Sequence, residues 1–183
     1  MPQYKSVPLD SAYRLINHGP VLLISSRSRR GRFDLAPIAW ACPVGMEPCQ
    51  VLLAMSPGHQ TFRNIQAERG FIVCVPGKAQ VKWVREAGSI SGTQADKFAK
   101  FKIPSFPGKK VRAQIPQGTV AYLECNWQRT IRLKEVALVI GRCVHAAALA
   151  QAYQGRLRAE KPEGKTLHHL GGNVFMVPGD KLA

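Results

Sequence analysis

Several common features are missing from this 183-residue sequence. No stretch approaches the ~20 uninterrupted apolar residues that a membrane-spanning helix needs, and the N-terminus has no apolar segment typical of secretory signals. The motifs GxSxG, HExxH, GxxxxGK[ST] and GxGxxG are also absent. Classical hydrolase, zinc-protease, P-loop and Rossmann interpretations are therefore unsupported. We expect a single cytoplasmic domain over residues 1–183, with no membrane segment.

Cysteines and acidic residues are few, and their placement excludes further classes of site. The five cysteines include no CxxC pair, so neither a disulfide framework nor a zinc site is expected. Most of them lie inside apolar runs, which predicts buried, reduced thiols. The 11 acidic residues include no close pair, which argues against the two-carboxylate chemistry of glycosidases. We expect no metal site.

Positive charge is the strongest compositional signal, with a formal net charge of +15. Such a charge suits nucleic acid, an anionic membrane or a small anionic ligand. The basic residues concentrate in three segments broken by Gly or Pro, 27–32, 97–112 and 155–165, and each is typical of a solvated loop. The middle segment alternates phenylalanines with lysines, which fits either a platform for single-stranded nucleic acid or core aromatics beside a helix. The core interpretation is the commoner one, and nucleic-acid binding is the weaker hypothesis.

Apolar patterns predict a chain rich in strands. Strands are expected at residues 21–26, 34–45, 50–56, 71–75, 119–131, 135–149 and 173–177, and helices at 9–16, 62–69, 81–87 and 95–101. Thr61 is the expected N-cap of the second helix and Gly70 its stop. Pro37 and Pro43 within one strand imply an edge, a bulge or amides that face something other than a strand. Short, closely spaced strands favour a closed antiparallel barrel over a wound parallel sheet.

The stretch MSPGHQTFRNI, residues 55–65, raises two interpretations. Ser56, Gln60 and Thr61 lie at the start of the second helix, where free N–H groups and the helix dipole favour an anion. A plain helix cap explains the same residues equally well.

Two further stretches remain open in the same way. In SISGTQADKF, residues 89–98, a loop of small residues permits close approach of a ligand before Asp96, Lys97 and Phe98. A solvated acid and base at a helix start is the alternative. In HHLGGNVF, residues 168–175, Gly171 and Gly172 either let the backbone lie against a flat ring or form a β-turn before the last strand.

Taken in order, these segments resemble the flavin reductase-like, flavoredoxin-type branch of the FMN-binding split-barrel family. The resemblance is carried by residues 21–76, by SISGTQADKF and by the terminal HLGGNVF, so it covers most of the chain from 21 to 175. It implies a mainly β fold: a six-stranded antiparallel split β-barrel with flanking short helices. It also implies a homodimer with FMN near the subunit interface.

The resemblance further implies roles for individual residues. The isoalloxazine would lie beside the segment Ala39, Trp40, Ala41 and Cys42, with Gly171 and Gly172 also at the cofactor. The phosphate would be held by Ser56, Gln60 and Thr61, and Asn64 would support the ribityl side. Substrate contacts would come from Asp96, Lys97, Phe98 and His168. Relatives commonly have Ser or Thr where this chain has Ala39, and often Asn where it has Asp34, so these positions lose polar contacts.

The expected function is that of an FMN-binding oxidoreductase. It takes a hydride from NADH or NADPH onto the flavin and passes electrons to free flavin, ferric iron or a partner protein. Because the cofactor supplies this chemistry, no catalytic residue is assigned. The positive charge, Lys97 included, would attract the anionic flavin and nicotinamide nucleotides. A non-enzymatic FMN electron carrier is the alternative, followed by a basic nucleic-acid-binding barrel.

Overall fold

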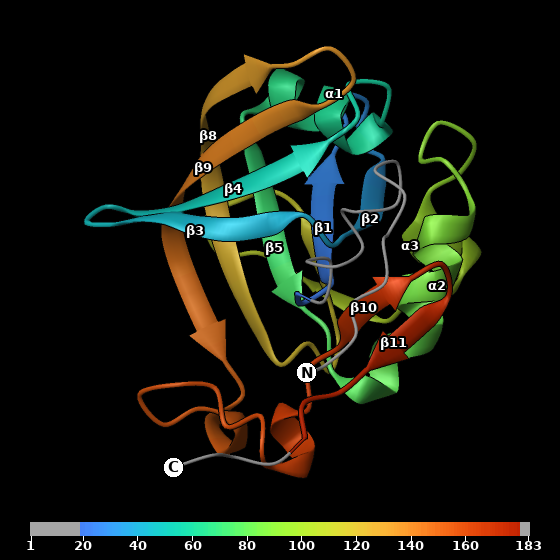
Figure 1. Ribbon diagram of the computed structural model, residues 1–183. Helices are drawn as coiled ribbons and strands as arrows, with labels where there is room; N and C mark the ends of the chain where they lie inside the picture. Colours follow the sequence, from blue (N-terminus) through green and yellow to red (C-terminus); the bar gives the residue numbers. More distant parts are fainter. Residues whose placement is uncertain (1–18, 180–183) are drawn as a thin grey trace, which may run out of the picture.

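A computed structural model describes residues 19–179, so the helix predicted at 9–16 lies outside the described residues. The chain forms a strongly bent antiparallel sheet, with short helices beside it (Figure 1). Seven strands are hydrogen-bonded in the order β2-β1-β5-β8-β9-β4-β3. Their bounds are β1 Leu22–Arg27, β2 Phe33–Ile38, β3 Ala41–Met46, β4 Cys49–Met55, β5 Gly70–Val75, β8 Ala121–Arg132 and β9 Ala137–Ala148.

The two edge strands of this sheet are consecutive in the chain. β2 ends at Ile38, β3 begins at Ala41, and only Ala39 and Trp40 connect them. The carbonyl of Trp40 accepts a 2.8 Å hydrogen bond from the N–H of Ala54, but β2 and β3 are not neighbours in the sheet. The sheet is therefore open at this connection, as in a split barrel. The single strand predicted at 34–45 is wrong, because the apolar run continues while the chain crosses between edges.

The two prolines of that run confirm the edge interpretation. Pro37 lies in β2 and Pro43 in β3, at opposite edges of the sheet. A bulge interrupts the pairing of β3 with β4 between Pro43 and Gly45. Edge strands and bulges tolerate proline because they leave N–H groups outside the ladder.

The buried side chains form two clusters, and adjacent residues of β1 belong to different ones. Leu23 belongs to the first cluster and Ile24 to the second, because successive side chains of a strand point to opposite faces. The first cluster also includes Leu35, Ile72, Val84, Ala87 and Phe98. The second includes Leu53, Phe62, Ile65, Phe71 and Val139.

Among residues 19–179, three α-helices flank the sheet: α1 (Gln60–Glu68), α2 (Val81–Ser89) and α3 (Lys97–Lys100). The same part of the chain has three 3₁₀ turns, at Lys78–Gln80, Ala150–Ala152 and Pro162–Gly164. The predicted ends of α1 are wrong. His59 is its N-cap, and the helix closes at Arg69, which has a φ of 59°. Thr61 instead lies in the first turn, and Gly70 begins β5.

Two small hairpins complete the described fold, β6 (Ser105–Pro107) with β7 (Gln114–Pro116), and β10 (His168–Gly171) with β11 (Val174–Met176). Only β11 was expected, because strands this short show no periodicity. Among residues 19–179, no helix is long and apolar enough to cross a membrane.

The expectation of buried thiols is correct for only some of the five cysteines. Cys74 and Cys125 are buried and Cys143 is half-buried, whereas Cys42 and Cys49 are exposed. Burial raises the pKa of the Cys74 and Cys125 thiols. Both exposed cysteines lie in the β3–β4 hairpin, an edge element that projects from the sheet (Figure 1).

Candidate functional site

Three adjoining cavities lie beside the β2–β3 connection, and Pro37 lines all of them. The Trp40 cavity, about 380 Å³, is lined by Ala39, Trp40, Ser56, His59 and His169, among others. The α1 cavity, about 440 Å³, is lined by His59, Gln60, Thr61 and the loop at 89–94. The Phe175 cavity, about 600 Å³, is lined by Arg85, Glu86, His169, Asn173 and Phe175.

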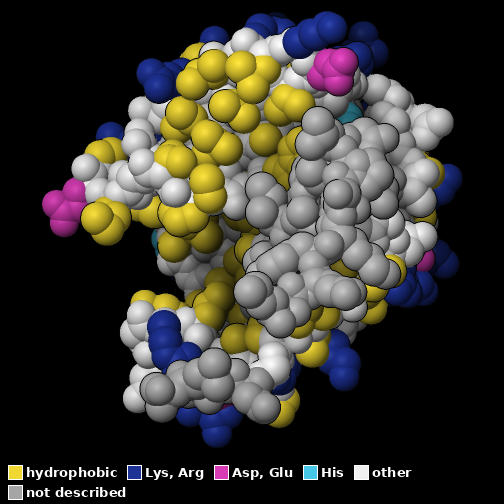
Figure 2. Space-filling model, in the orientation of Figure 1, with side chains coloured by type: hydrophobic (Ala, Val, Ile, Leu, Met, Phe, Trp, Pro, Cys, Tyr) yellow, Lys and Arg dark blue, Asp and Glu magenta, His cyan; other side chains and the backbone are white. Residues whose placement is uncertain are grey.

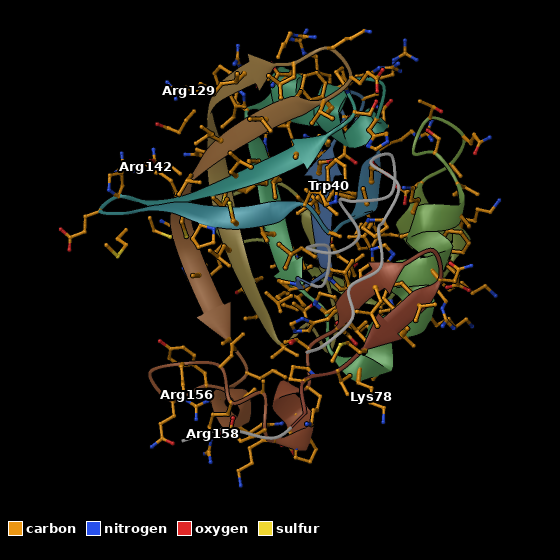
Figure 3. The ribbon with its side chains drawn as sticks, in the orientation of Figure 1. Trp40, Lys78, Arg129, Arg142, Arg156 and Arg158 are labelled. Carbon is orange, nitrogen blue, oxygen red and sulfur yellow. The ribbon has the colours of Figure 1, made fainter. Side chains whose placement is uncertain are left out.

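The Trp40 cavity gathers five of the predicted cofactor-binding residues from three separate segments. Ala39 and Trp40 come from the β2–β3 connection, Ser56 from the end of β4, and Gly171 and Gly172 from the β10–β11 turn. Trp40 is 46% exposed, and Figure 3 labels its position. Residues some 130 positions apart in sequence therefore line one cavity.

The paired glycines serve the turn and also leave room beside the cavity. Gly171 has a φ of 117° and Gly172 a φ of 54°, conformations that a side chain disfavours. A Cβ at either position would have no heavy atom within 4 Å. From the sequence, a β-turn and a backbone surface open to a flat ring were alternatives for these two glycines. The structure has both the turn and the open surface.

Ala41 and Cys42 do not line the described cavities. Both belong to β3, where they pair with Leu53 and Leu52 of β4. Ala41 packs against the second core cluster, and Cys42 is exposed. The resemblance implied that both lie beside the cofactor, but the lining of the Trp40 cavity includes Ala39 and Trp40 and stops before Ala41.

The N-terminus of α1 provides unpaired backbone donors to the α1 cavity. Within residues 19–179 the N–H groups of Gln60, Thr61 and Phe62 have no hydrogen-bond acceptor, and no side chain caps the helix. The Ser56 hydroxyl oxygen accepts a 3.2 Å bond from the N–H of Gly58, so its own proton remains available. Unpaired N–H groups at the positive end of a helix dipole favour an anion.

The side chains of Thr61 and Asn64 link this end of α1 to strands β2 and β1. The Thr61 hydroxyl donates to Asp34 Oδ2 at 2.6 Å, and the residue is only 1% exposed. Asn64 donates to the Ser26 hydroxyl at 3.0 Å and accepts from Gln60 Nε2 at 2.7 Å. The expectation that the Thr61 hydroxyl donates to a phosphate is therefore wrong, because its one proton is already donated to Asp34.

Lys97 does not present the free cation that the sequence led us to expect. Its Nζ lies 3.2 Å from Asp34 Oδ1 and donates to the carbonyl of Leu35 at 2.8 Å. Both members of this ion pair are buried, yet both line the α1 cavity. Gly92 covers the carboxylate so closely that a Cβ there would overlap Asp34. A carboxylate thus balances the ammonium group beside the α1 donors.

The other residues expected to bind substrate line none of the three cavities. Asp96 caps α3, accepting from the N–H of Ala99 at 3.1 Å and of Phe33 at 3.2 Å. Phe98 is buried in the first core cluster and meets Phe33 edge to face at 6.4 Å. His168 pairs with Met176 in the β10–β11 hairpin and lines none of the three cavities.

His169 occupies the position in the cavities that was expected of His168. Its ring lies 5.4 Å from the Phe175 ring, with Nε2 2.9 Å from the carbonyl of Gly172. Neighbouring strand residues face opposite ways, so one histidine of the pair had to face the cavities, but the pattern could not show which. His59, Pro37 and Arg85 were also missed; Arg85 lies over the Phe175 ring at 5.6 Å.

The comparisons with known proteins agree with this geometry. The family model described as the flavin reductase like domain matches residues 14–161. The uncharacterized protein YddH of Escherichia coli is 31% identical over 186 residues, covering 100% of this chain and 98% of its own.

Two solved structures share the fold. Nitrilotriacetate monooxygenase component B from Bacillus cereus superposes with a TM-score of 0.88 at 19% identity, covering 100% of both chains. An FMN-binding domain of a flavin reductases-like enzyme from Shewanella baltica has a TM-score of 0.79 at 25% identity, covering 98% of this chain and 96% of its own. Together with the family match, the split barrel and its cavities show that this chain belongs to the flavin reductase-like family of FMN-binding split-barrel proteins.

Proposed function

We propose that this protein is an FMN-dependent oxidoreductase that accepts a hydride from NADH or NADPH. Electrons would then pass to free flavin, ferric iron or a partner protein. The observation that carries the proposal is the set of unpaired N–H groups at α1 beside the Trp40 cavity. Those donors suit a phosphate, and the indole with the Gly171–Gly172 backbone suits a flat ring.

The residues of the two cavities fit the parts of FMN. The amides of Gln60, Thr61 and Phe62, with the Ser56 hydroxyl, would hold the phosphate; Ala39, Trp40 and Gly172 would hold the ring. When bound, FMN supplies the ability to take up a hydride and release electrons singly or in pairs. The chain itself binds, orients and shields the reacting groups. The adjoining Phe175 cavity, with Arg85 at its wall, would accept the nicotinamide nucleotide.

Titration with FMN followed by anaerobic mixing with NADH and NADPH tests this proposal. If the protein is a reductase, FMN should bind, and its absorbance near 450 nm should be bleached within seconds, roughly the time that one turnover of a typical enzyme takes. FMN binding without bleaching would favour an electron carrier instead. Failure to bind any flavin, with salt-sensitive binding to single-stranded DNA, would favour the nucleic-acid alternative.

A Gln60→Pro substitution tests the backbone donors directly. Gln60 is the first residue of α1, where proline is tolerated, and His59 has φ −70° and ψ 142°, an extended conformation that suits a residue before proline. The change removes one N–H without breaking the helix. We expect FMN affinity to fall about tenfold, as for loss of one bond to a charged group, measured by calorimetric titration.

The matched control is Gln60→Ala, which also loses the side-chain bond to Asn64 but keeps the N–H. Riboflavin serves as a second control because it has no phosphate. The Pro variant should bind riboflavin as the Ala variant does. Equal FMN affinities for the two variants would show that the Gln60 N–H does not hold the phosphate.

A homodimer is part of the same proposal. Figure 2 shows hydrophobic side chains gathered over the upper-left face, where β3, β4 and β9 lie in Figure 1. Five large exposed apolar side chains come from these strands and from the β8–β9 hairpin: Val44, Met46, Ile131, Leu133 and Val144. An apolar surface of this kind marks an interface, and C2 symmetry is the commonest way to close one.

Met46, which is 91% exposed in one chain, offers a test of this interface. We expect Met46→Glu with Val44→Glu to weaken dimerisation about 100-fold, because each would bury a charge in an apolar contact. Sedimentation equilibrium with FMN present should then report the 20.1 kDa monomer. Tyr153→Glu, an exposed aromatic outside this face, is the control. A wild-type protein that is monomeric at micromolar concentration would contradict the proposal.

A further inference from the structure

A fourth cavity, the arginine cavity, lies next to the α1 cavity. Its volume is about 360 Å³, and it shares Asp34, Gln60 and Gly92 with the α1 cavity. Four arginines line it: Arg29, Arg30 and Arg32 from the β1–β2 turn, and Arg63 from α1. It shares no lining residue with the Trp40 cavity. The α1 donors therefore separate the indole from this basic cavity.

The turn that presents three of these arginines is held in place by its own hydrogen bonds. The N–H of Ser28 donates to the Arg32 carbonyl at 2.8 Å, and the N–H of Arg32 donates to the Ser28 hydroxyl at 3.1 Å. Gly31 adopts a φ of 86° at the reversal. Arg32 Nη2 also donates to the Gly92 carbonyl at 3.2 Å. The turn is thus tied to the loop that covers Asp34.

The charge of this cavity is not balanced by the protein. Within residues 19–179, none of the four arginines forms an ion pair, and the one acid that lines the cavity, Asp34, is paired with Lys97. Figure 2 shows Lys and Arg side chains along the upper edge of the molecule, the end where α1 lies in Figure 1. The four arginines are exposed residues that line one cavity, and like charges gathered in this way repel one another and favour a polyanion.

From this arrangement we infer that the arginine cavity binds the second phosphate and the adenosine of FAD. The inference rests on the proposed function, with the flavin ring in the Trp40 cavity and its first phosphate at α1. The order of the cavities then matches the order of groups along FAD: ring, first phosphate, second phosphate, adenosine. FMN ends at the first phosphate and leaves the four arginines without an anion.

The position of the cavity selects FAD over a nicotinamide nucleotide. A nicotinamide must stack near the flavin ring, and the Phe175 cavity adjoins the Trp40 cavity through Pro37, Ala39, His169 and Gly172. The arginine cavity shares none of these residues. Guanidinium groups also suit both halves of the ligand, because they bind phosphate in a bidentate manner and stack on flat rings.

Calorimetric titration of the full chain with FAD, FMN and riboflavin tests the assignment. We expect FAD to bind about tenfold more tightly than FMN, and this advantage to shrink as salt rises. An Arg30→Gln, Arg63→Gln double variant should lose about 10- to 100-fold in FAD affinity and less than about threefold in FMN affinity. Arg129→Gln with Arg142→Gln is the control, since both are exposed strand arginines that line none of these cavities (Figure 3).

The outcomes separate this inference from the proposed function. Equal affinities for FAD and FMN, or equal losses in the double variant, would overturn the FAD assignment while FMN binding still supports an FMN oxidoreductase. A variant that leaves both flavins unchanged but raises the KM for NADPH would overturn it as well, because the cavity would then serve the hydride donor. Absence of binding by any flavin would overturn both.

Discussion

Asp34→Asn is expected to tighten FMN binding about 100-fold. Asp34 places a carboxylate beside the α1 donors, where it occupies the Thr61 hydroxyl and the Lys97 ammonium. Asparagine keeps the shape and an acceptor oxygen but removes the negative charge. Lys97 then has no anionic partner in the ligand-free protein, and the phosphate of an incoming FMN forms an ion pair with it instead. A gain of this size equals one or two bonds to a charged group.

The same substitution should destabilise the ligand-free protein. Removing one member of a buried ion pair leaves the other charge uncompensated, at a cost of about 3–5 kcal/mol. FMN should restore most of this loss, so the FMN-induced rise in Tm should be larger for Asp34→Asn than for the wild type. Calorimetric titration with FMN and riboflavin, alongside thermal melts, measures both effects. Riboflavin affinity should change little because riboflavin has no phosphate.

Glu163→Gln, an exposed acid in the 3₁₀ turn Pro162–Gly164, changes the net charge equally and lies away from the cavities. It should leave FMN affinity and Tm unchanged. If Asp34→Asn bound FMN no better than the wild type, the Asp34–Lys97 pair would have no influence on the phosphate site.

Glu124→Gln is expected to lower the free energy of unfolding at pH 7 by about 3 kcal/mol or more. Glu124 is fully buried, and its carboxylate accepts three backbone N–H bonds from one loop. Oε1 accepts from Lys109 at 2.8 Å, and Oε2 accepts from Lys110 at 2.6 Å and from Val111 at 2.7 Å. Glutamine has one acceptor oxygen, so its amide group would face N–H donors. Each lost bond to a charged group costs about 1.5–3 kcal/mol.

This contribution should depend on pH with a definite sign. Burial alone raises the pKa of Glu124, but the three N–H donors outweigh it, and the net pKa lies below the ordinary value of 4.5. A carboxyl whose folded pKa is lowered stabilises the fold fully above its unfolded pKa and loses that effect as pH falls through the folded value. The stability difference between wild type and Glu124→Gln should therefore be constant near neutrality and shrink below about pH 4.5.

Urea denaturation across pH 3–7 measures this difference, with Glu163→Gln as the exposed control. A gap between wild type and Glu124→Gln that does not shrink in acid would show that Glu124 acts through packing rather than through its charge.

The local structure of this protein follows from its sequence in considerable detail. The apolar runs at 21–26, 50–56 and 71–75 became β1, β4 and β5 with shifts of one residue, because burial on two faces requires uninterrupted apolar residues. Pro37 and Pro43 correctly marked edge strands. The ordered motifs also identified the family. Ser56, Trp40 and the paired glycines, which the sequence assigned to the cofactor, line one cavity in the structure.

The tertiary structure alone decided how the polar groups of the site are used. Thr61 and Lys97 have the chemistry to bind a phosphate, but each already meets Asp34, a partner 27 or 63 positions earlier in the chain. Likewise, the β2–β3 break, the choice of His169 over His168 and the gathering of four arginines depend on how the sheet bends. Hydrophobic periodicity records which residues are buried. It carries no information about which buried donor meets which acceptor, because that pairing is set only when distant strands and loops pack together.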